Sequence, residues 1–249
     1  MLLDRSEQDH SSFFEGSQFP QLLELQNKWT SVAEEAQAAL ERLGFLRFRF
    51  PSIYDVEKPG IVGRRGMFYF QILGARLKRN CQMAPRTADL LERVPGLATA
   101  AFYVLGPGAH ILPHTGVAQD LMLRAHLGLI CPPECYLRIG DEKQSWAEGQ
   151  WMVFDDTLEH EAWNASDRTR CVLSLDFMPE PPDDAKQRLR SLRRSMLGSK
   201  MSESPWYLAA GLDEEPEFLE QMEAAASTVK PGRTRLIESV VEGQGLFFT

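Results

Sequence analysis

The chain has 249 residues, of which 43% are hydrophobic and 25% are charged, and its formal net charge is −8 at pH 7. This length can bury a sizeable core, and the composition is that of an ordinary globular protein. The acidic balance argues against non-specific nucleic-acid binding, which needs a concentrated basic surface. No window approaches the ~18 consecutive apolar residues of a membrane helix, and the first residues lack the form of a signal peptide. We therefore expect a cytoplasmic protein that binds neither nucleic acid nor membrane.

The predicted elements follow the order helix, strands, helix. Apolar residues at helical spacing predict a helix over residues 19–43, which Gly44 would end. Short apolar runs rich in β-branched and aromatic residues then predict strands, with Gly and Pro turns separating several of them. These runs cover residues 67–73, 99–105, 124–130, 136–139, 151–154 and 171–177. Further helices are predicted over residues 84–93, 183–200 and 214–226.

Two histidines and one arginine outline a site for a metal ion and an oxoacid. His114 lies in a Pro-His-Thr-Gly corner, His160 follows Asp-Asp-Thr-Leu-Glu, and Arg170 lies at the start of the last apolar run. Neutral imidazoles bind Fe(II) and leave coordination positions for an oxoacid and for dioxygen. A guanidinium can hold the far carboxylate of a dicarboxylic oxoacid such as 2-oxoglutarate through two parallel hydrogen bonds. Histidines that only pack in the structure are the alternative interpretation.

Gly116 departs from the usual pattern for non-haem iron. Two histidines commonly act with a carboxylate two residues after the first of them, and glycine cannot be a ligand. Either water or a halide fills this position, or a carboxylate comes from elsewhere in the chain. Asp156, four residues before His160, is a candidate to accept a hydrogen bond that orients a ligand imidazole.

Many short strands broken by Gly and Pro are typical of a β-sandwich or barrel, and the paired histidines favour the double-stranded β-helix. The expected fold is thus mainly β, a cupin-like jelly roll with flanking N- and C-terminal helices. We expect an N-terminal helical support region over residues 1–62, a catalytic core over 63–180 and a C-terminal helical extension over 181–249. An apolar cluster at residues 205–208 could cap the barrel, form a lid or contact a second subunit in a homodimer.

The motifs PHTG, LRAHLGL, W-x-x-G, FDDTLEHEAWN and R-x-VLSLDF resemble the aspartyl/asparaginyl β-hydroxylase family of oxygenases that depend on Fe(II) and 2-oxoglutarate. The resemblance covers residues 14–180. It implies that His114 and His160 are the iron ligands of a centre without a carboxylate. It also implies that Arg170 binds the far carboxylate of 2-oxoglutarate, and that Arg124 and His126 line the oxoacid and substrate pocket.

Departures from the family pattern concern the co-substrate and the substrate. Tyr103 stands eleven residues before the first ligand, where protein-hydroxylating members have a serine that helps to hold the co-substrate. Its hydroxyl could still donate from a longer arm. Arg65 and Met67 replace a tryptophan and a glutamine near the peptide-binding edge. A small molecule is therefore at least as well supported as a folded protein substrate, and Arg64, Arg65 or Arg124 could pair with its carboxylate.

The resemblance implies a hydroxylase that acts on an amino acid, a peptide or a carrier-tethered small molecule. Halogenation or desaturation with the same cofactors stays open, because Gly116 leaves a coordination position vacant. A non-catalytic cupin-like barrel that binds a metabolite or partner is a further alternative. Apolar residues are expected to wall the reaction chamber, with ordinary core packing as the other interpretation. They are Phe102, Leu105, Leu127, Leu129 and Phe154.

Overall fold

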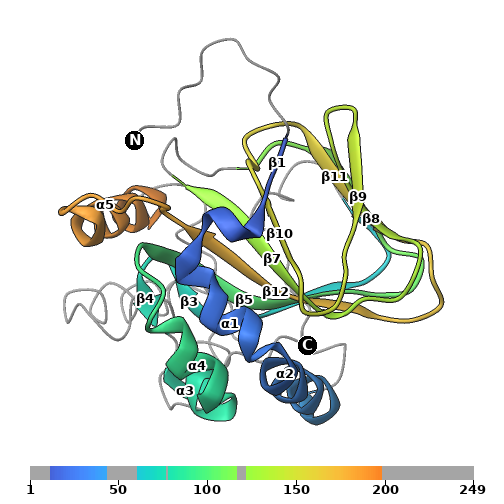
Figure 1. Cartoon of the computed structure of the whole chain (residues 1–249), viewed down its shortest axis with the longest axis horizontal. Coiled ribbons are helices and arrows are strands. Elements are labelled where there is room, and N and C mark those ends of the chain that lie inside the picture. Colours follow the sequence, from blue (N-terminus) through green and yellow to red (C-terminus); the bar gives the residue numbers. More distant parts are fainter. Residues whose placement is uncertain (1–11, 44–60, 77, 117–121, 198–249) are drawn as a thin grey trace, which may run out of the picture.

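The computed structural model describes residues 12–43, 61–76, 78–116 and 122–197, which form two antiparallel sheets and a layer of helices (Figure 1). The larger sheet has the order β1 (Phe13–Phe14), β10 (Trp151–Phe154), β7 (Leu123–Ile130), β12 (Arg170–Phe177), β5 (Leu97–Leu105), β3 (Arg65–Ile72) and β4 (Ala75–Arg76). The smaller sheet has the order β2 (Ile61–Val62), β6 (His110–His114), β11 (His160–Asn164), β8 (Cys135–Ile139) and β9 (Glu142–Ser145).

The connectivity of β5 to β12 is that of a jelly roll. Strands β5, β7, β10 and β12 lie in the larger sheet, and β6, β8, β9 and β11 lie in the smaller one. The chain therefore crosses between the sheets after nearly every strand, and the eight strands enclose one interior. Strands β1, β3 and β4 extend the larger sheet, and β2 extends the smaller one. The expected double-stranded β-helix is confirmed.

Side chains on the larger sheet alternate between two cores, as the period of two along a strand requires. On β5, Phe102 belongs to the core between sheet and helices, while Leu105 belongs to the core inside the barrel. The expectation of a five-residue chamber wall is therefore wrong in part. Leu105 and Phe154 do face the interior, but Phe102, Leu127 and Leu129 pack on the helix side. An unbroken apolar run does not reveal which of its residues face which side.

The helices of the N-terminal half cover the outer face of the larger sheet, where α1 to α4 gather in Figure 1. They are η1 (Gly16–Gln18), η2 (Pro20–Leu22), α1 (Leu23–Asn27), α2 (Trp29–Leu43), α3 (Lys78–Met83) and α4 (Pro85–Leu91). The helix predicted over 19–43 is real but divided at Lys28, whose backbone leaves the helical region. Both parts bury residues in the same core, among them Leu25 and Val32.

One further helix follows the barrel. α5 (Ala185–Leu197) confirms the first of the two predicted C-terminal helices, whereas the helix predicted over 214–226 and the apolar cluster at 205–208 lie outside the described residues. Among the helices described, none has the length and hydropathy that crossing a membrane requires.

Candidate metal and oxoacid site

His114 and His160 are brought to the same face of the smaller sheet by a bulge. His160 lies opposite His114 on the neighbouring strand, whereas Ala162 lies opposite Ile111, so β6 contains one extra residue over this stretch. A bulge of this kind re-aims the side chains that follow it. The two imidazole rings consequently meet, with their centroids 4.3 Å apart.

Both imidazoles are oriented by backbone carbonyls. The Nδ1 atom of His114 lies 2.8 Å from the oxygen of Leu112, and that of His160 lies 2.8 Å from the oxygen of Leu158. A carbonyl can only accept, so each Nδ1 donates and each Nε2 keeps its lone pair in the neutral ring. Burial lowers the pKa of His160 to about 4, so this ring is neutral at physiological pH. Two such nitrogens suit a divalent metal ion.

Asp156 fills the space beside Gly116. A Cβ atom added at Gly116 would lie 2.0 Å from Oδ2 of Asp156, and the Gly116 N–H donates to the Asp156 carbonyl oxygen at 2.6 Å. Glycine is needed here because any side chain would displace this carboxylate. Asp156 was expected to orient a ligand imidazole, and this expectation is wrong, because the carbonyls of Leu112 and Leu158 do so instead.

Asp156 pairs with Arg124. Nη1 of Arg124 lies 2.9 Å from Oδ2 of Asp156, a distance that makes an ion pair, although neither carboxylate oxygen has a hydrogen bond of good geometry within the described chain. Nε of Arg124 donates to Oδ1 of Asp176 at 2.7 Å. Burial raises the pKa of Asp156 to about 6, with Arg124 acting in the opposite direction. Arg124 thus compensates the charge of this fully buried carboxylate, whose oxygens can still accept further hydrogen bonds.

Arg170 is a fully buried cation. Its Nη1 donates to the carbonyl oxygen of Tyr103 at 3.2 Å, and its guanidinium carbon lies 4.5 Å from the centre of the Trp146 ring. Its Nε and Nη2 atoms have no hydrogen-bond partner among the described residues. Burial lowers the pKa of Arg170, but arginine stays protonated in proteins. Unpaired donors on a buried cation cost free energy, which a bound anion would offset.

His126 adds a neutral donor beside this cation. Its Nδ1 atom lies 3.3 Å from the indole Nε1 of Trp146, and its Nε2 atom is buried without a partner in the described chain. Burial and then the charges of Arg170 and Arg124 hold the pKa of His126 well below its ordinary value. The neutral ring accepts from the indole, so the proton resides on Nε2.

Tyr103 lies against the same arginine. Its ring centre is 5.3 Å from the guanidinium carbon of Arg170, and its hydroxyl accepts from Nη1 of Arg65 at 3.5 Å. Arginine has no acceptor, so the hydroxyl proton can be donated to another group. Arg64, by contrast, is exposed and lies just before β3. Apart from Arg64, the structure brings together the residues predicted for the site, and it adds Trp146 and a contact between Arg65 and Tyr103.

Within the described residues, no group of three or more His, Cys, Asp and Glu side chains could hold a metal ion. Among the residues that the structure describes, the side chains placed to hold a metal ion are the two imidazoles of His114 and His160. This donor set fits a metal ion that keeps other coordination positions for an oxoacid and dioxygen. The unpaired donors of Arg170 and His126 fit the oxoacid's carboxylates.

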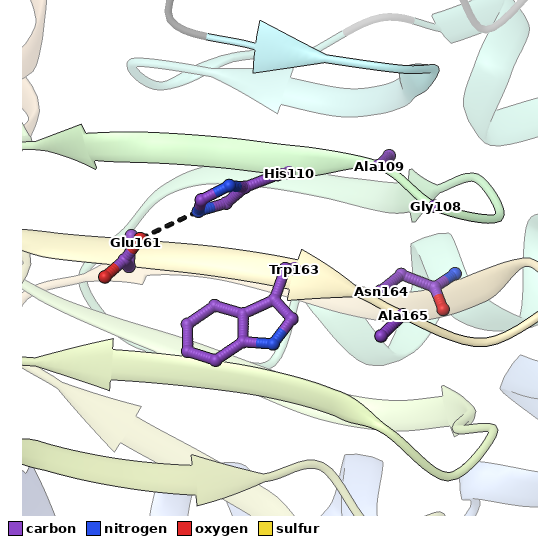
Figure 2. Close-up of a pocket in the computed structure, with 7 residues that line it drawn as sticks. All are labelled: Gly108, Ala109, His110, Glu161, Trp163, Asn164 and Ala165. Carbon is purple, nitrogen blue, oxygen red and sulfur yellow. Dashed lines mark hydrogen bonds and ion pairs between the residues drawn. The ribbon is translucent and has the colours of Figure 1, made fainter.

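A separate hollow of about 600 Å³ lies on the outer face of the smaller sheet (Figure 2). In it Nε2 of His110 and Oε2 of Glu161 lie 2.7 Å apart, and Glu161 also pairs with Arg138. Trp163 lies beside this pair in Figure 2. Its lining is Gly108, Ala109, His110, Glu161, Trp163, Asn164 and Ala165. None of the residues predicted for the metal and oxoacid site lines this hollow.

The fold and site define a jelly-roll protein with a candidate two-histidine metal centre beside a buried arginine. A sequence profile of the aspartyl/asparaginyl beta-hydroxylase family matches residues 26–179. The chain belongs to this family.

Named relatives include a bacterial and a human protein. The ornithine lipid ester-linked acyl 2-hydroxylase of Rhizobium tropici is 32% identical over 168 residues, which are 66% of this chain and 59% of the relative. The aspartyl/asparaginyl beta-hydroxylase of Homo sapiens is 30% identical over 174 residues, which are 68% of this chain and 22% of the relative. The chain thus spans less than two thirds of the length of either relative.

Similarity to solved structures is lower. A prolyl-4-hydroxylase of Pseudomonas putida aligns with 61% of this chain and 86% of its own, with a TM-score of 0.39 and 17% identity.

Proposed function

We propose that this protein is an Fe(II)- and 2-oxoglutarate-dependent oxygenase that hydroxylates an amino acid, a peptide or a carrier-tethered small molecule. The observation that carries the proposal is the pair of imidazoles, with ring centroids 4.3 Å apart, in the same interior as Arg170, a buried cation two of whose nitrogens have no hydrogen-bond partner in the described part of the chain. A metal ion would bind the two imidazoles, and an anionic ligand would accept hydrogen bonds from Arg170. Hydroxylation is the reaction shared by the names of the two relatives.

Different residues of the chain would bind the metal ion and the co-substrate. Nε2 atoms of His114 and His160 would hold Fe(II), and Nε and Nη2 of Arg170 would hold the far carboxylate of 2-oxoglutarate. The Nε2–H of His126 and the hydroxyl of Tyr103 are further donors for the oxoacid. Fe(II), together with 2-oxoglutarate and dioxygen, supplies the oxidising chemistry that converts a C–H bond into an alcohol.

The substrate would approach from the exposed side of His114. Arg124 is a candidate to pair with a substrate carboxylate, but two aspartates already engage its Nε and Nη1 atoms. A substrate anion would therefore have to share this cation with Asp156 and Asp176. The relatives' names include both a lipid-linked acyl chain and amino-acid residues, which supports a broad substrate range for the family and keeps a small molecule beside a peptide as a candidate substrate.

Asp156 favours hydroxylation over halogenation. A halide at the position that Gly116 leaves open would lie beside a buried carboxylate, and two anions close together in a low dielectric repel each other. A neutral water molecule could instead donate hydrogen bonds to the carboxylate oxygens. A chloride-dependent product would contradict this argument.

The proposal is tested by mixing the full chain with Fe(II) and 2-oxoglutarate without oxygen and recording the weak visible charge-transfer band of the complex. His160→Ala should abolish the band. His110→Ala is a matched control, because His110 lies on the same strand as His114 but on the outer face, so the band should persist. Succinate release in air is then screened with amino acids and dipeptides. A wild-type protein that binds no divalent metal ion would overturn the proposal and favour a non-catalytic barrel.

A further inference from the structure

We propose that Trp146 is a positioning residue for the oxoacid: its indole N–H keeps the proton of His126 on Nε2, and its ring holds the guanidinium of Arg170 in place. The inference rests on the proposed function, because it takes His126 and Arg170 as the oxoacid's binding groups. Trp146 itself lies between β9 and β10 and is buried.

The hydrogen bond from Trp146 selects one of two forms of His126. A neutral imidazole carries its proton on either nitrogen, and only the form with Nδ1 unprotonated can accept from an indole, which is a donor only. The distance from Nε1 of Trp146 to Nδ1 of His126 is 3.3 Å. With this bond in place the Nε2 atom of His126 is a donor, and this buried atom has no hydrogen-bond partner among the residues that the structure describes. The opposite form would present a lone pair to a carboxylate and repel it.

The same indole also stacks on the cation. The guanidinium carbon of Arg170 lies 4.5 Å from the centre of the Trp146 ring and 5.3 Å from that of Tyr103. Contacts between a guanidinium and an aromatic face are favourable and restrict the side chain to one orientation. Trp146 thus touches both residues whose unpaired donors would receive the oxoacid.

The backbone around Trp146 is fixed to the strand that carries His126. The Gly128 N–H donates to the oxygen of Gln150 at 3.1 Å, and the Gly149 N–H donates to the oxygen of Gly128 at 2.9 Å. A Cβ atom added at Gly128 would lie 2.1 Å from the carbonyl oxygen of Ala147. Only glycine lets this segment approach β7 so closely. Because Gly128 lies two residues after His126 on the same strand, these backbone contacts fix the position of the indole relative to the imidazole.

The proposal is tested with two substitutions and a matched control in the full chain loaded with Mn(II). Trp146→Phe removes the indole N–H and keeps an aromatic face, and we expect the affinity for 2-oxoglutarate to fall about 3- to 10-fold, as for one neutral hydrogen bond. Trp146→Leu removes both contacts and should lower the affinity further. Trp151→Phe is the control, because its indole N–H donates to the oxygen of Leu22 on the helix side. The affinity of Trp151→Phe for 2-oxoglutarate should equal that of the wild type.

Calorimetric titration with 2-oxoglutarate gives the affinities, and the nitrogen chemical shifts of His126 in labelled, ligand-free protein give the position of its proton. The wild type should show a protonated Nε2, and Trp146→Phe should show a mixture of the two forms. A wild type with the proton on Nδ1 overturns the inference even if the variants fail to fold, and so does an unchanged affinity in folded Trp146→Phe. A wild type that does not bind 2-oxoglutarate at all would instead overturn the proposed function.

Discussion

The two faces of the larger sheet differ in the polarity of the side chains that they carry. Strands β5, β7 and β12 present almost only apolar side chains to the helices, among them Phe102, Leu127 and Leu173. Toward the barrel interior β7 and β12 present His126, Arg124 and Arg170. The helix side contributes stability through buried apolar area, whereas on the interior face Nε and Nη2 of Arg170 and Nε2 of His126 have no hydrogen-bond partner among the described residues. The apolar face thus stabilises a sheet whose other face carries the proposed ligand-binding groups, and burying those polar groups without partners costs stability.

The first prediction concerns a substitution in the core between the larger sheet and the helices. Phe102 is fully buried, and its ring centre lies 4.9 Å from that of Phe70. Phe102→Ala should lower the free energy of unfolding by about 3–5 kcal/mol, because a cavity adds to the lost apolar burial. Urea unfolding measures the change, and Phe102→Leu should lose much less. The variant that remains folded should bind 2-oxoglutarate as the wild type does. A loss of affinity as large as the loss of stability would show that the two faces are not separate.

The sequence predicted the parts of the fold in which apolar residues dominate. Strands β3, β5, β7, β8, β10 and β12 were expected from their apolar runs, and each is present. Strands β6, β9 and β11 were not, because His-Ile-Leu-Pro-His, Glu-Lys-Gln-Ser and His-Glu-Ala-Trp-Asn carry polar side chains on their exposed faces. Two of these strands, which no apolar run marked, carry the histidines; the jelly-roll architecture had implied a strand for each histidine. Polar strands at a functional site lack the pattern from which strands are predicted.

The sequence also identified the residues of the candidate site, but not how they are held. His114 and His160 were found from their motifs, whereas the bulge that turns His114 inward depends on pairing between strands and has no local signal. Trp146 was noted within the W-x-x-G motif without a role, because its contacts with His126 and Arg170 join three separate segments. Contacts of this kind follow from the fold.

The second prediction concerns the crowded end of the interior. Gly116→Ala places a methyl group 2.0 Å from Oδ2 of Asp156, and overpacking of this kind costs about 1–3 kcal/mol. We expect a loss of stability within this range and weaker metal binding, because His114 is two residues away. Combining it with Asp156→Ala should recover part of the stability, giving a coupling of about 0.5 kcal/mol or more in a double-mutant cycle. Strictly additive losses would mean that the carboxylate does not occupy this space.

The third prediction concerns Arg170 and has the smallest expected effect on the free energy of unfolding. Unlike most substitutions of a buried residue, this one is not expected to destabilise the protein. Arg170→Met replaces a buried cation with an apolar side chain, and removing buried charge in this way is often neutral or stabilising. We expect the unfolding free energy of the ligand-free protein to stay within about 1 kcal/mol of the wild type or to rise, because the cost of burying the cation is removed and this offsets the loss of its charge-assisted hydrogen bond to the Tyr103 carbonyl. The affinity for 2-oxoglutarate should fall by about 1.5–3 kcal/mol, as expected for a hydrogen bond to a charged group.

Thermal unfolding with and without 2-oxoglutarate separates these two effects of Arg170→Met. The wild type should be stabilised by ligand, because ligand that binds only the folded state raises its stability, and the variant should be stabilised less at the same ligand concentration. Arg168→Met, two residues away and exposed, should leave both quantities unchanged. A contrary result would be that Arg170→Met destabilises the ligand-free protein by as much as Phe102→Ala does. The interior face would then contribute to stability as the helix face does, and Nε and Nη2 of Arg170 would have hydrogen-bond partners within the protein.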